Sequence, residues 1–531
     1  MSQLLMPPLG PSCAMPLDPR LLDRVIASKR ALFAGERLPD QPSEDLLDVE
    51  SLVKILARPA RTRPDTLTAP GANLATVVGS RKVLVLLVDF SDSPATQDQQ
   101  HYRDLLFSQG TLGTGSMRDF YREASYGQLD VDGTVNGSGG AVSGWYRAPQ
   151  PKSYYTNGEY GFGDHPRNAQ RLVEDVLELA AADVDFSDYD KDGDGSVEAL
   201  VMVCAGSGAE QTGNKNDIWS HKWGIEPQVR NGVTLSTYFM APEDGRVGVM
   251  AHELGHLLLG WPDLYDTDYS SAGTGMWDLM AAGSWNGAGD RPAHPTAWCK
   301  LKAGWVTPVT VFGSEQEITL EAYETSAHVV KLPVGSATGK EYFLLSNRQQ
   351  TGFDDEIPAS GMLIEHCDDS RSNNTDESHY LVDVEQSDGR RDLNLNANRG
   401  DADDVYPGAG NTAFDAGSTP NSRSYAGSDS GVAVTGITRT ENRVSAQISN
   451  SAHNGGAGPQ WLYNQRITAT YAHHTEQFAW VHVEGLGWRR VKEGAADGVS
   501  NLFDMCNEAV AHSRTVHVSV DGESLYTAYL V

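Results

Sequence analysis

The feature that most constrains this chain is a short apolar stretch carrying two histidines and a glutamate. It reads Val249-Met250-Ala251-His252-Glu253-Leu254-Gly255-His256, a His-Glu-x-x-His pattern with no other charged side chain around it. Histidines four residues apart lie one turn apart on the same face of a helix, so both imidazole rings can reach a single ion. The pattern therefore predicts a helix with a metal-binding face.

Zinc suits such a pair of ligands. Imidazole nitrogen is a good zinc ligand, and a tetrahedral site with three protein ligands leaves one position for water. Glu253, next to the first histidine, is placed to take a proton from that water and to pass it to a leaving amine, while zinc polarises the scissile carbonyl. The alternative is a core or surface helix that carries two histidines by chance, and the apolar flanks disfavour it.

A zinc enzyme of this kind needs a third protein ligand. Gly260 is a residue at which helices commonly end, and the following Trp261-Pro262-Asp263 turns the chain back. Asp263 is therefore the first carboxylate placed to approach the metal. Two alternatives stay open: Asp266 is a nearby rival, and Asp263 could simply cap or solvate the turn.

The residues around this helix resemble one family. His252–His256, followed by Gly260–Asp266 and then by Trp277–Trp285, is similar to the M6 zinc metalloendopeptidases, whose namesake is immune inhibitor A. The similarity runs from about residue 80 to about residue 450. Other segments similar to its catalytic domain are Val83–Phe90, Ser116–Gly127, Asp188–Leu200 and Ile218–His221.

The resemblance implies an α+β protein with a zincin-like catalytic domain, zinc as cofactor, and hydrolysis of peptide bonds in proteins or peptides as a metalloendopeptidase of the EC 3.4.24 type. It also implies that Met280 lies in a tight turn beneath the zinc; from the residues alone, Met280 is equally well a core methionine. In the usual spacing of the family, Gly260 and Asp263 would each come one residue earlier. One extra residue rotates a helix position by about 100°, so the approach of Asp263 must adjust.

Changes in composition and in secondary-structure pattern along the chain predict four parts. Residues 1–80, rich in proline, form an N-terminal pro-like helical segment and linker. Residues 81–305 alternate strand and helix patterns and form the zincin-like catalytic domain. Short alternating β patterns then predict a β-rich domain at 306–450, and a Gly-rich linker separates it from a small C-terminal β-module at 459–531.

An acidic loop precedes the buried strand expected at Ala199–Cys204. Asp190, Asp192, Asp194 and Glu198 offer carboxylates at alternating positions, with glycines between them that permit a tight turn. Oxygen ligands at this spacing fit Ca²⁺, so the loop predicts a structural calcium site. The alternative is a solvated acidic turn.

One cysteine, Cys13, lies between prolines near the start of the chain. A thiolate is a strong zinc ligand, and here it could occupy the water position and keep the enzyme latent until the segment is removed. An incidental free thiol is the simpler reading, and the sequence alone favours it.

Composition excludes several other functions. The chain has 531 residues with 71 acidic and 41 basic side chains, and its formal net charge of −30 disfavours nucleic acid and anionic lipid as partners. No apolar run approaches the ~20 residues of a membrane helix, so no membrane insertion is expected. The five cysteines are too few and too scattered for a disulfide framework or a thiolate zinc site.

Location and function leave alternatives. The family resemblance implies an extracellular protein, although the start, MSQLLMPPLGPSCAMP, lacks the basic and apolar parts of a readable signal peptide. The main alternative function is a catalytically silent zincin-fold protein that binds a partner or a glycan through its β-domains. A third class is a metal-dependent amidase or esterase that uses the same chemistry. The sequence predicts neither the cleavage specificity nor the oligomeric state.

Overall fold

A computed structural model describes residues 13–24, 76–451 except 138, 141, 143 and 409, and then 460–472, 479–491, 498–520 and 524–530. The fold is a mixed α+β arrangement with many strands and few helices. Of the helical segment expected within residues 1–80, residues 19–24 lie in the described part and are helical. The rest of that expectation lies outside the described residues.

A seven-stranded sheet forms the first half of the described structure. Its strand order is β1-β6-β7-β5-β2-β3, with β4 also beside β2. The strands β3, β2, β5 and β7 run parallel, whereas β6 at the edge is antiparallel to β7, and the two-residue β1 is antiparallel to β6. The bounds are β1 (Cys13–Ala14), β2 (Gly79–Asp89), β3 (Leu129–Asn136), β4 (Tyr146–Arg147), β5 (Ala199–Cys204), β6 (His221–Arg230) and β7 (Val233–Pro242).

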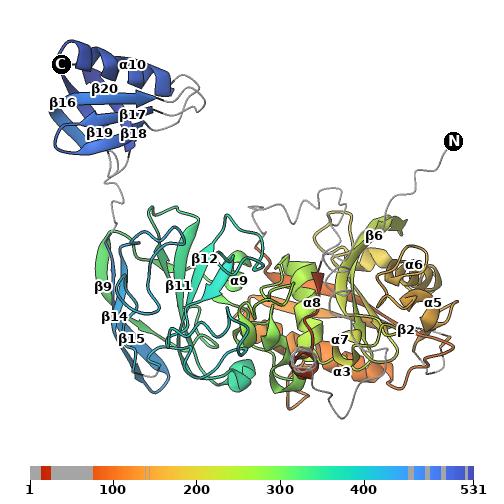
Figure 1. Ribbon diagram of the computed structural model, residues 1–531. Coiled ribbons are helices and arrows are strands. Elements are labelled where there is room, and N and C mark those ends of the chain that lie inside the picture. Colours follow the sequence, from red (N-terminus) through yellow and green to blue (C-terminus); the bar gives the residue numbers. More distant parts are fainter. Residues whose placement is uncertain are drawn as a thin grey trace, which may run out of the picture.

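Two of the helices that cover this sheet show how capping side chains set where a helix begins. Ser116 forms a capping box with Asp119 at the start of α4, and the side chain of Asn168 accepts a hydrogen bond at the start of α6. The most buried helix, α8, lies near the middle of the molecule (Figure 1). The bounds are α3 (Gln99–Phe107), α4 (Met117–Ala124), α5 (Lys152–Thr156), α6 (Ala169–Ala180), α7 (Ala209–Thr212), α8 (Val247–Leu259) and α9 (Ala297–Lys302), with 3-10 turns η1 (Phe186–Tyr189), η2 (Gly275–Trp277), η3 (Ala282–Gly289) and η4 (Gly352–Glu356).

Two further sheets follow α9. One has the order β13-β12-β11-β10-β8 and the other β14-β15-β9, and both carry apolar side chains of one shared core, such as Phe343 and Ile448. Other side chains of β11 and β12, including Tyr342 and Cys367, belong to the core of the seven-stranded sheet. The main hydrophobic core therefore continues into these strands. The bounds are β8 (Val309–Thr310), β9 (Ser314–Leu320), β10 (Val330–Pro333), β11 (Glu341–Arg348), β12 (Gly361–Asp368), β13 (Val382–Val384), β14 (Val432–Thr440) and β15 (Arg443–Asn450).

The last part of the chain is a closed barrel with the order β16-β17-β18-β20-β19, and α10 (Gly498–Ala511) packs against it (Figure 1). The sequence predicted strands here but no helix. Its signal was present, because Val499, Leu502, Phe503 and Cys506 recur at helical spacing and contribute to the barrel core. The strands are β16 (Gln460–Ala472), β17 (Ala479–Val483), β18 (Gly487–Val491), β19 (Thr515–Val520) and β20 (Ser524–Leu530).

Across the described residues, no helix combines the length and apolarity needed to span a membrane.

Candidate metal centre

Helix α8 carries the His-Glu-x-x-His pattern and is buried along most of its length. A Cβ atom added at Gly255 would lie 3.0 Å from the Sδ of Met280 and 3.0 Å from the ring of Trp261, so glycine allows both side chains to approach the helix between the two histidines. The helix ends as expected, with Gly260 in the left-handed conformation at a φ of 67°.

Both histidines of α8 are held in one orientation by main-chain carbonyls. The Nδ1–H of His252 donates to the carbonyl of Leu279 over 2.9 Å, and that of His256 donates to the carbonyl of Trp261 over 2.6 Å. Because a carbonyl can only accept, these bonds place the ring proton on Nδ1 and leave each Nε2 lone pair free for another ligand. The two Nε2 atoms lie 3.0 Å apart.

Asp263 brings a third acceptor to the same point. Its Oδ1 lies 3.0 Å from the Nε2 of His256 and 3.3 Å from that of His252, but it has no hydrogen-bond donor among the described residues. Three acceptors this close repel one another unless a cation lies between them. Ligands of a tetrahedral zinc are about 3.4 Å apart, given metal–ligand distances of about 2.1 Å. The donor set and its spacing therefore fit zinc.

The protonation of the cluster follows the same logic. Burial opposes protonation of His256, but the nearby charges of Cys13 and Asp263 outweigh it and raise the pKa of His256 well above its usual value. In His252 burial prevails and lowers the pKa.

Glu253 is the other polar side chain of this helix face. It is fully buried, and neither of its carboxylate oxygens has a hydrogen-bond partner among the described residues. Burial raises the pKa of Glu253 well above its usual value. A buried carboxylate without a partner is costly, and such groups are concentrated at functional sites.

Met280 is fully buried, and its side chain lies against Gly255. Its carbonyl accepts hydrogen bonds from the main chain of Leu264 over 2.9 Å and of Tyr265 over 3.3 Å. These bonds tie the turn that contains Met280 to the loop that carries Asp263. The sequence placed Met280 near the metal, and its role there stays a prediction.

The rival aspartate faces other partners. Asp266 accepts hydrogen bonds from the side chains of Ser270 and Ser271 and from the main chain of Asp268. The carboxylate that meets the two histidines is therefore that of Asp263, despite its unusual spacing.

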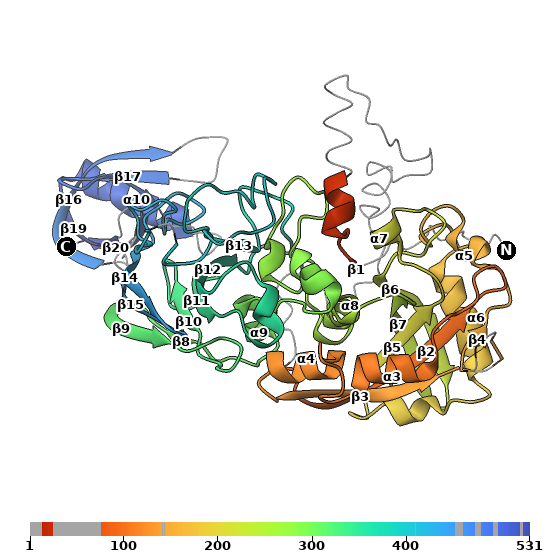
Figure 2. The ribbon, with the colours of Figure 1, turned by 90° about the horizontal axis from the view of Figure 1, so that it is seen from below.

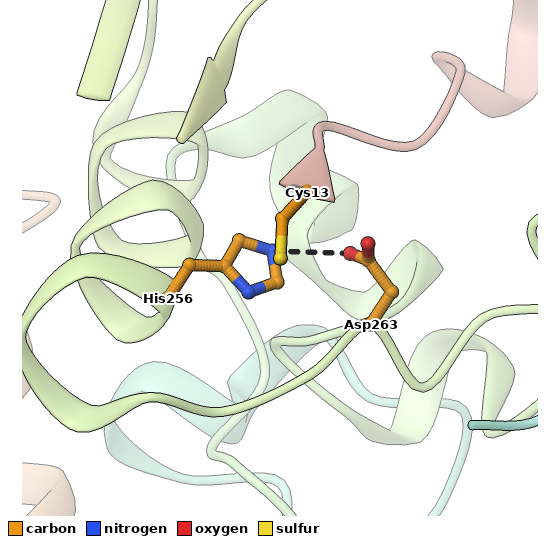
Figure 3. Close-up of side chains that lie close together, drawn as sticks. All are labelled: Cys13, His256 and Asp263. Carbon is orange, nitrogen blue, oxygen red and sulfur yellow. Dashed lines mark ion pairs between the residues drawn. The ribbon is translucent and has the colours of Figure 1, made fainter. Parts of the chain in front are cut away.

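Cys13 lies at this site as well. Its Sγ, a ring nitrogen of His256 and a carboxylate oxygen of Asp263 are all within 4.8 Å of one another, and Figure 3 shows the thiol between the two side chains. The sequence alone favoured an incidental thiol, because nothing local indicates that residue 13 folds back onto residues near 260. The contact depends on the tertiary structure, in which β1 pairs with β6.

The acidic loop forms a second cluster, away from the helix. Oxygen atoms of Asp190, Asp192 and Asp194 lie within 4.8 Å of one another. The fourth predicted ligand, Glu198, is not part of this group, and one of its oxygens accepts a hydrogen bond from the main chain of Lys82 over 2.8 Å.

Sequence reasoning missed the groups that orient the histidines. These are the carbonyls of Leu279 and Trp261, and a main-chain carbonyl carries no signature in the sequence. It also missed that two tyrosines bind the main chain of the N-terminal segment. Tyr265 donates a hydrogen bond to the carbonyl of Ala14 over 2.8 Å, and the hydroxyl of Tyr269 accepts one from the main chain of Leu17 over 3.4 Å.

A buried histidine pair on one helix, joined by an aspartate and an unpartnered glutamate, is the side-chain set of zinc-dependent hydrolases. Residues 72–307 match the family described as immune inhibitor A peptidase M6, catalytic domain. This part of the chain is therefore similar to the catalytic domain of the M6 peptidases, a family that implies zinc as its metal.

Two curated relatives carry the same resemblance. The pre-pro-metalloprotease PrtV of Vibrio cholerae serotype O1 (strain M66-2) is 31% identical over 313 residues, covering 47% of this chain and 32% of the relative. Immune inhibitor A of Bacillus thuringiensis subsp. alesti is 32% identical over 266 residues, covering 40% of this chain and 38% of the relative. The chain thus spans about a third of the length of the curated relatives it matches.

A solved structure of catalytic inactive OgpA from Akkermansia muciniphila, in complex with an O-glycopeptide (glycodrosocin) substrate, aligns over 59% of this chain and 89% of that chain. The sequence identity is 16% and the TM-score is 0.24, a score that does not establish a common fold.

Proposed function

We propose that this protein is a zinc-dependent endopeptidase with a zincin-like catalytic domain. The observation that carries the proposal is the convergence of three buried acceptors, from His252, His256 and Asp263, beside the unpartnered carboxylate of Glu253. The M6 match over residues 72–307 supports protein or peptide substrates. The predicted division of the chain into parts at 1–80, 81–305, 306–450 and 459–531 belongs to the same proposal.

In this proposal His252, His256 and Asp263 hold the metal. Zinc supplies a Lewis acid that polarises the scissile carbonyl and lowers the pKa of water. The carbonyls of Leu279 and Trp261 keep both imidazoles in the tautomer that a metal needs.

Glu253 is the proposed general base. Burial raises its pKa, so the carboxylate binds a proton more readily than an exposed glutamate would. It takes the proton of the attacking water and then, as a general acid, delivers that proton to the nitrogen of the leaving amine. The absence of hydrogen-bond donors to Glu253 among the described residues keeps both of its oxygens available for this transfer.

The proposal is tested by the substitution Glu253→Gln. We expect hydrolysis of casein and of a quenched peptide to fall by about 10²- to 10⁴-fold, as on loss of a general base, while the zinc content stays at one ion per chain. Glu315→Gln, an exposed substitution on β9, is the matched control and should leave both quantities unchanged.

Each form is assayed before and after limited proteolysis of its N-terminal segment, with and without a chelator. Equal hydrolysis by the parent and by Glu253→Gln would show that the carboxylate is not the base. A zinc-loaded parent that hydrolyses nothing after proteolysis would instead favour the silent, partner-binding alternative.

We also propose calcium at the acidic loop, with Asp190, Asp192 and Asp194 as ligands and Glu198 at its edge. The proposal is supported by the close approach of the three aspartates and by one oxygen each of Asp190 and Glu198 that is buried without a hydrogen-bond partner among the described residues. At fixed zinc, calcium should raise the melting temperature of the parent but not that of Asp192→Asn. An equal melting temperature with and without calcium in the parent would remove the site.

An extracellular location is proposed as well. It is supported by the name of one relative, which describes a pre-pro-metalloprotease. N-terminal sequencing of protein recovered from the culture medium should find this chain there in a processed form. Recovery of the chain only from within cells would contradict the proposal.

A further inference from the structure

The described segment 13–18 begins as strand β1, which pairs with β6 at the edge of the seven-stranded sheet (Figure 2). In the antiparallel pairing of β1 with β6, Cys13 is opposite Lys222 and Ala14 is opposite His221. The ladder continues beyond β1, because the main-chain N–H of Met15 donates to the carbonyl of Ser220 over 3.0 Å. An exposed sheet edge that binds an extended peptide through its main chain is a common mode of peptide recognition.

Side chains from three separate segments bind the main chain of the same peptide. Three successive carbonyls of the segment each accept a hydrogen bond from a different side chain, and none of these bonds depends on the identity of the segment's side chains. Such bonds suit the recognition of many peptide sequences. The three bonds are Tyr265 Oη to Ala14 O at 2.8 Å, Trp219 Nε1 to Met15 O at 2.8 Å and Trp285 Nε1 to Pro16 O at 3.0 Å.

The side chains of this segment are buried as deeply as a protein core. Met15 is 0% exposed, Leu17 is 2% exposed and Ala14 is 3% exposed, and all three belong to the main hydrophobic cluster. A peptide held in this way excludes any other peptide from the same groove. It also shows that the groove accepts apolar side chains.

The register of the strand places Cys13 at the metal centre. Its Sγ is within 4.8 Å of ligand atoms of both His256 and Asp263, and its side chain points between them (Figure 3). Three protein ligands leave one position open on a tetrahedral zinc, and a thiolate is a strong ligand for it. The fully buried Glu253, without a partner among the described residues, independently indicates that this position is built to hold a ligand.

We propose that residues 13–18 are an internal inhibitor of the peptidase: they occupy the groove for the substrate main chain, and the thiolate of Cys13 takes the open position on zinc. This inference rests on the proposed function and adds its regulation. The segment must leave before a substrate can enter, and Tyr265, Trp219 and Trp285 then bind the main chain of an extended substrate peptide.

The coordination is tested first without any measurement of activity. Zinc is replaced by cobalt(II) in the full chain, in the Glu253→Gln background so that the chain does not cleave itself. A cysteine thiolate on cobalt gives a sulfur-to-metal charge-transfer band in the near ultraviolet, and we expect this band with Cys13 and its loss in Cys13→Ser. Identical spectra of the two proteins, each with one cobalt bound, would overturn the proposal.

The reactivity of the thiol provides a second measure in the same background. The other four cysteines are buried, so a maleimide reagent applied to the native protein reports mainly on Cys13. We expect zinc to slow the labelling of Cys13 at least ten-fold relative to the chelated protein, with mass spectrometry of the peptide as the readout. Equal rates with and without zinc would count against a metal-bound thiolate.

The inhibitory effect is tested in the active chain. The parent should hydrolyse a quenched peptide only after a lag, with an initial rate at least ten-fold below that of Cys13→Ser, whereas Cys506→Ser in the distant barrel should keep the lag. Equal initial rates of the parent and Cys13→Ser, together with a missing cobalt band, would refute the inhibitor while leaving the peptidase intact. Hydrolysis by no form, with the cobalt band present, would refute the peptidase and leave the thiolate ligand standing.

The shared groove makes a prediction that a purely structural role does not. Tyr265 binds a carbonyl of the inhibitor segment now and a carbonyl of the substrate later, so Tyr265→Phe should weaken both. We expect the lag of the otherwise unchanged chain to shorten about five-fold and, in the Cys13→Ser background, KM to rise about five-fold, the loss expected for one hydrogen bond. A variant that moves neither quantity would show that the segment does not mimic a substrate.

Discussion

Two buried clusters of charged side chains differ in how their charges are satisfied. The first is the cluster around Arg348, the last residue of β11. The guanidinium of Arg348 donates two hydrogen bonds to the carboxylate of Asp354, one from Nε over 2.9 Å and one from a terminal nitrogen over 2.8 Å. The other terminal nitrogen donates to the carbonyl of Trp277 over 2.8 Å. Both charged side chains are fully buried, and each meets the opposite charge directly.

The second is the metal centre on α8. There, His252, His256 and Asp263 turn lone pairs toward one another, and Glu253 has no hydrogen-bond partner among the described residues. In the first cluster two opposite charges, six residues apart in the chain, meet directly. In the second the side chains converge on a point that needs a cation. Arg348, Asp354, His252 and Glu253 are all fully buried, so direct pairing rather than burial distinguishes the Arg348–Asp354 pair from the metal centre.

The largest expected effects on stability and on zinc binding come from replacing one aspartate by asparagine in each cluster. Asp354→Asn removes the carboxylate that Arg348 binds directly and leaves only Glu324, 3.9 Å away, so it should lower the free energy of unfolding by about 3 kcal/mol. Asp263→Asn removes a metal ligand instead, so its main effect should be to abolish most of the rise in melting temperature that zinc gives the parent. Calorimetry of each variant, with excess zinc and with a chelator, measures both quantities.

The two substitutions serve as controls for each other, because each replaces a buried aspartate by asparagine. Asp354→Asn should keep the full zinc-dependent increment on a lower baseline. The distinction between the clusters is wrong if Asp354→Asn melts like the parent, or if Asp263→Asn keeps the zinc-dependent increment.

The sequence predicted those parts of the site that are local in the chain. The two histidines and Glu253 are related by helical spacing, and Gly260 ends the helix for a local conformational reason. The strand at Ala199–Cys204 has the predicted bounds because a continuous apolar run fits a strand covered on both faces.

Contacts between distant residues could not be predicted in this way. His294 meets Glu123 across 171 positions, and Tyr265 meets Ala14 across 251. No periodicity in one sequence indicates such pairs. The same limit applies to Cys13, whose place beside His256 depends on the pairing of β1 with β6. The helix α10 is a different case, because its apolar spacing was readable and was overlooked among the surrounding strand patterns.

His366 is a third buried group that extends the comparison, because it forms ion pairs with two carboxylates only when it is protonated. His366 on β12 lies 2.9 Å from Glu341 and 3.1 Å from Glu385. Burial opposes its protonation, but these two carboxylates prevail and raise the pKa of His366 to about 9. Because this pKa is above the unfolded value, the stabilisation is complete below about pH 6.5 and is lost as the pH rises through 9.

The contribution of His366 should amount to at most about 3 kcal/mol, from 1.36 kcal/mol for each unit of pKa difference. In His366→Gln, the fall in melting temperature between pH 6.5 and pH 9.5 should be clearly smaller than in the parent. The exposed His101 provides the matched control His101→Gln, which should keep the slope of the parent. A parent whose stability rises over this range would contradict the assignment.

The smallest expected effect is that of replacing Met280, the apolar side chain that packs against the helix of the metal centre. Met280 packs against Gly255 of helix α8, so Met280→Leu, which nearly conserves volume, should cost less than about 1.5 kcal/mol of unfolding free energy. Met202→Leu on β5, an equally buried methionine of the seven-stranded sheet, should cost a similar amount. Zinc titrations of both variants should give dissociation constants close to that of the parent. The contrary outcome is that Met280→Leu is the only one of the two variants that loses zinc, as is expected of Asp263→Asn. In that case the packing of Met280 would determine the geometry of the ligands, and the pairing of charges would not suffice to explain the site.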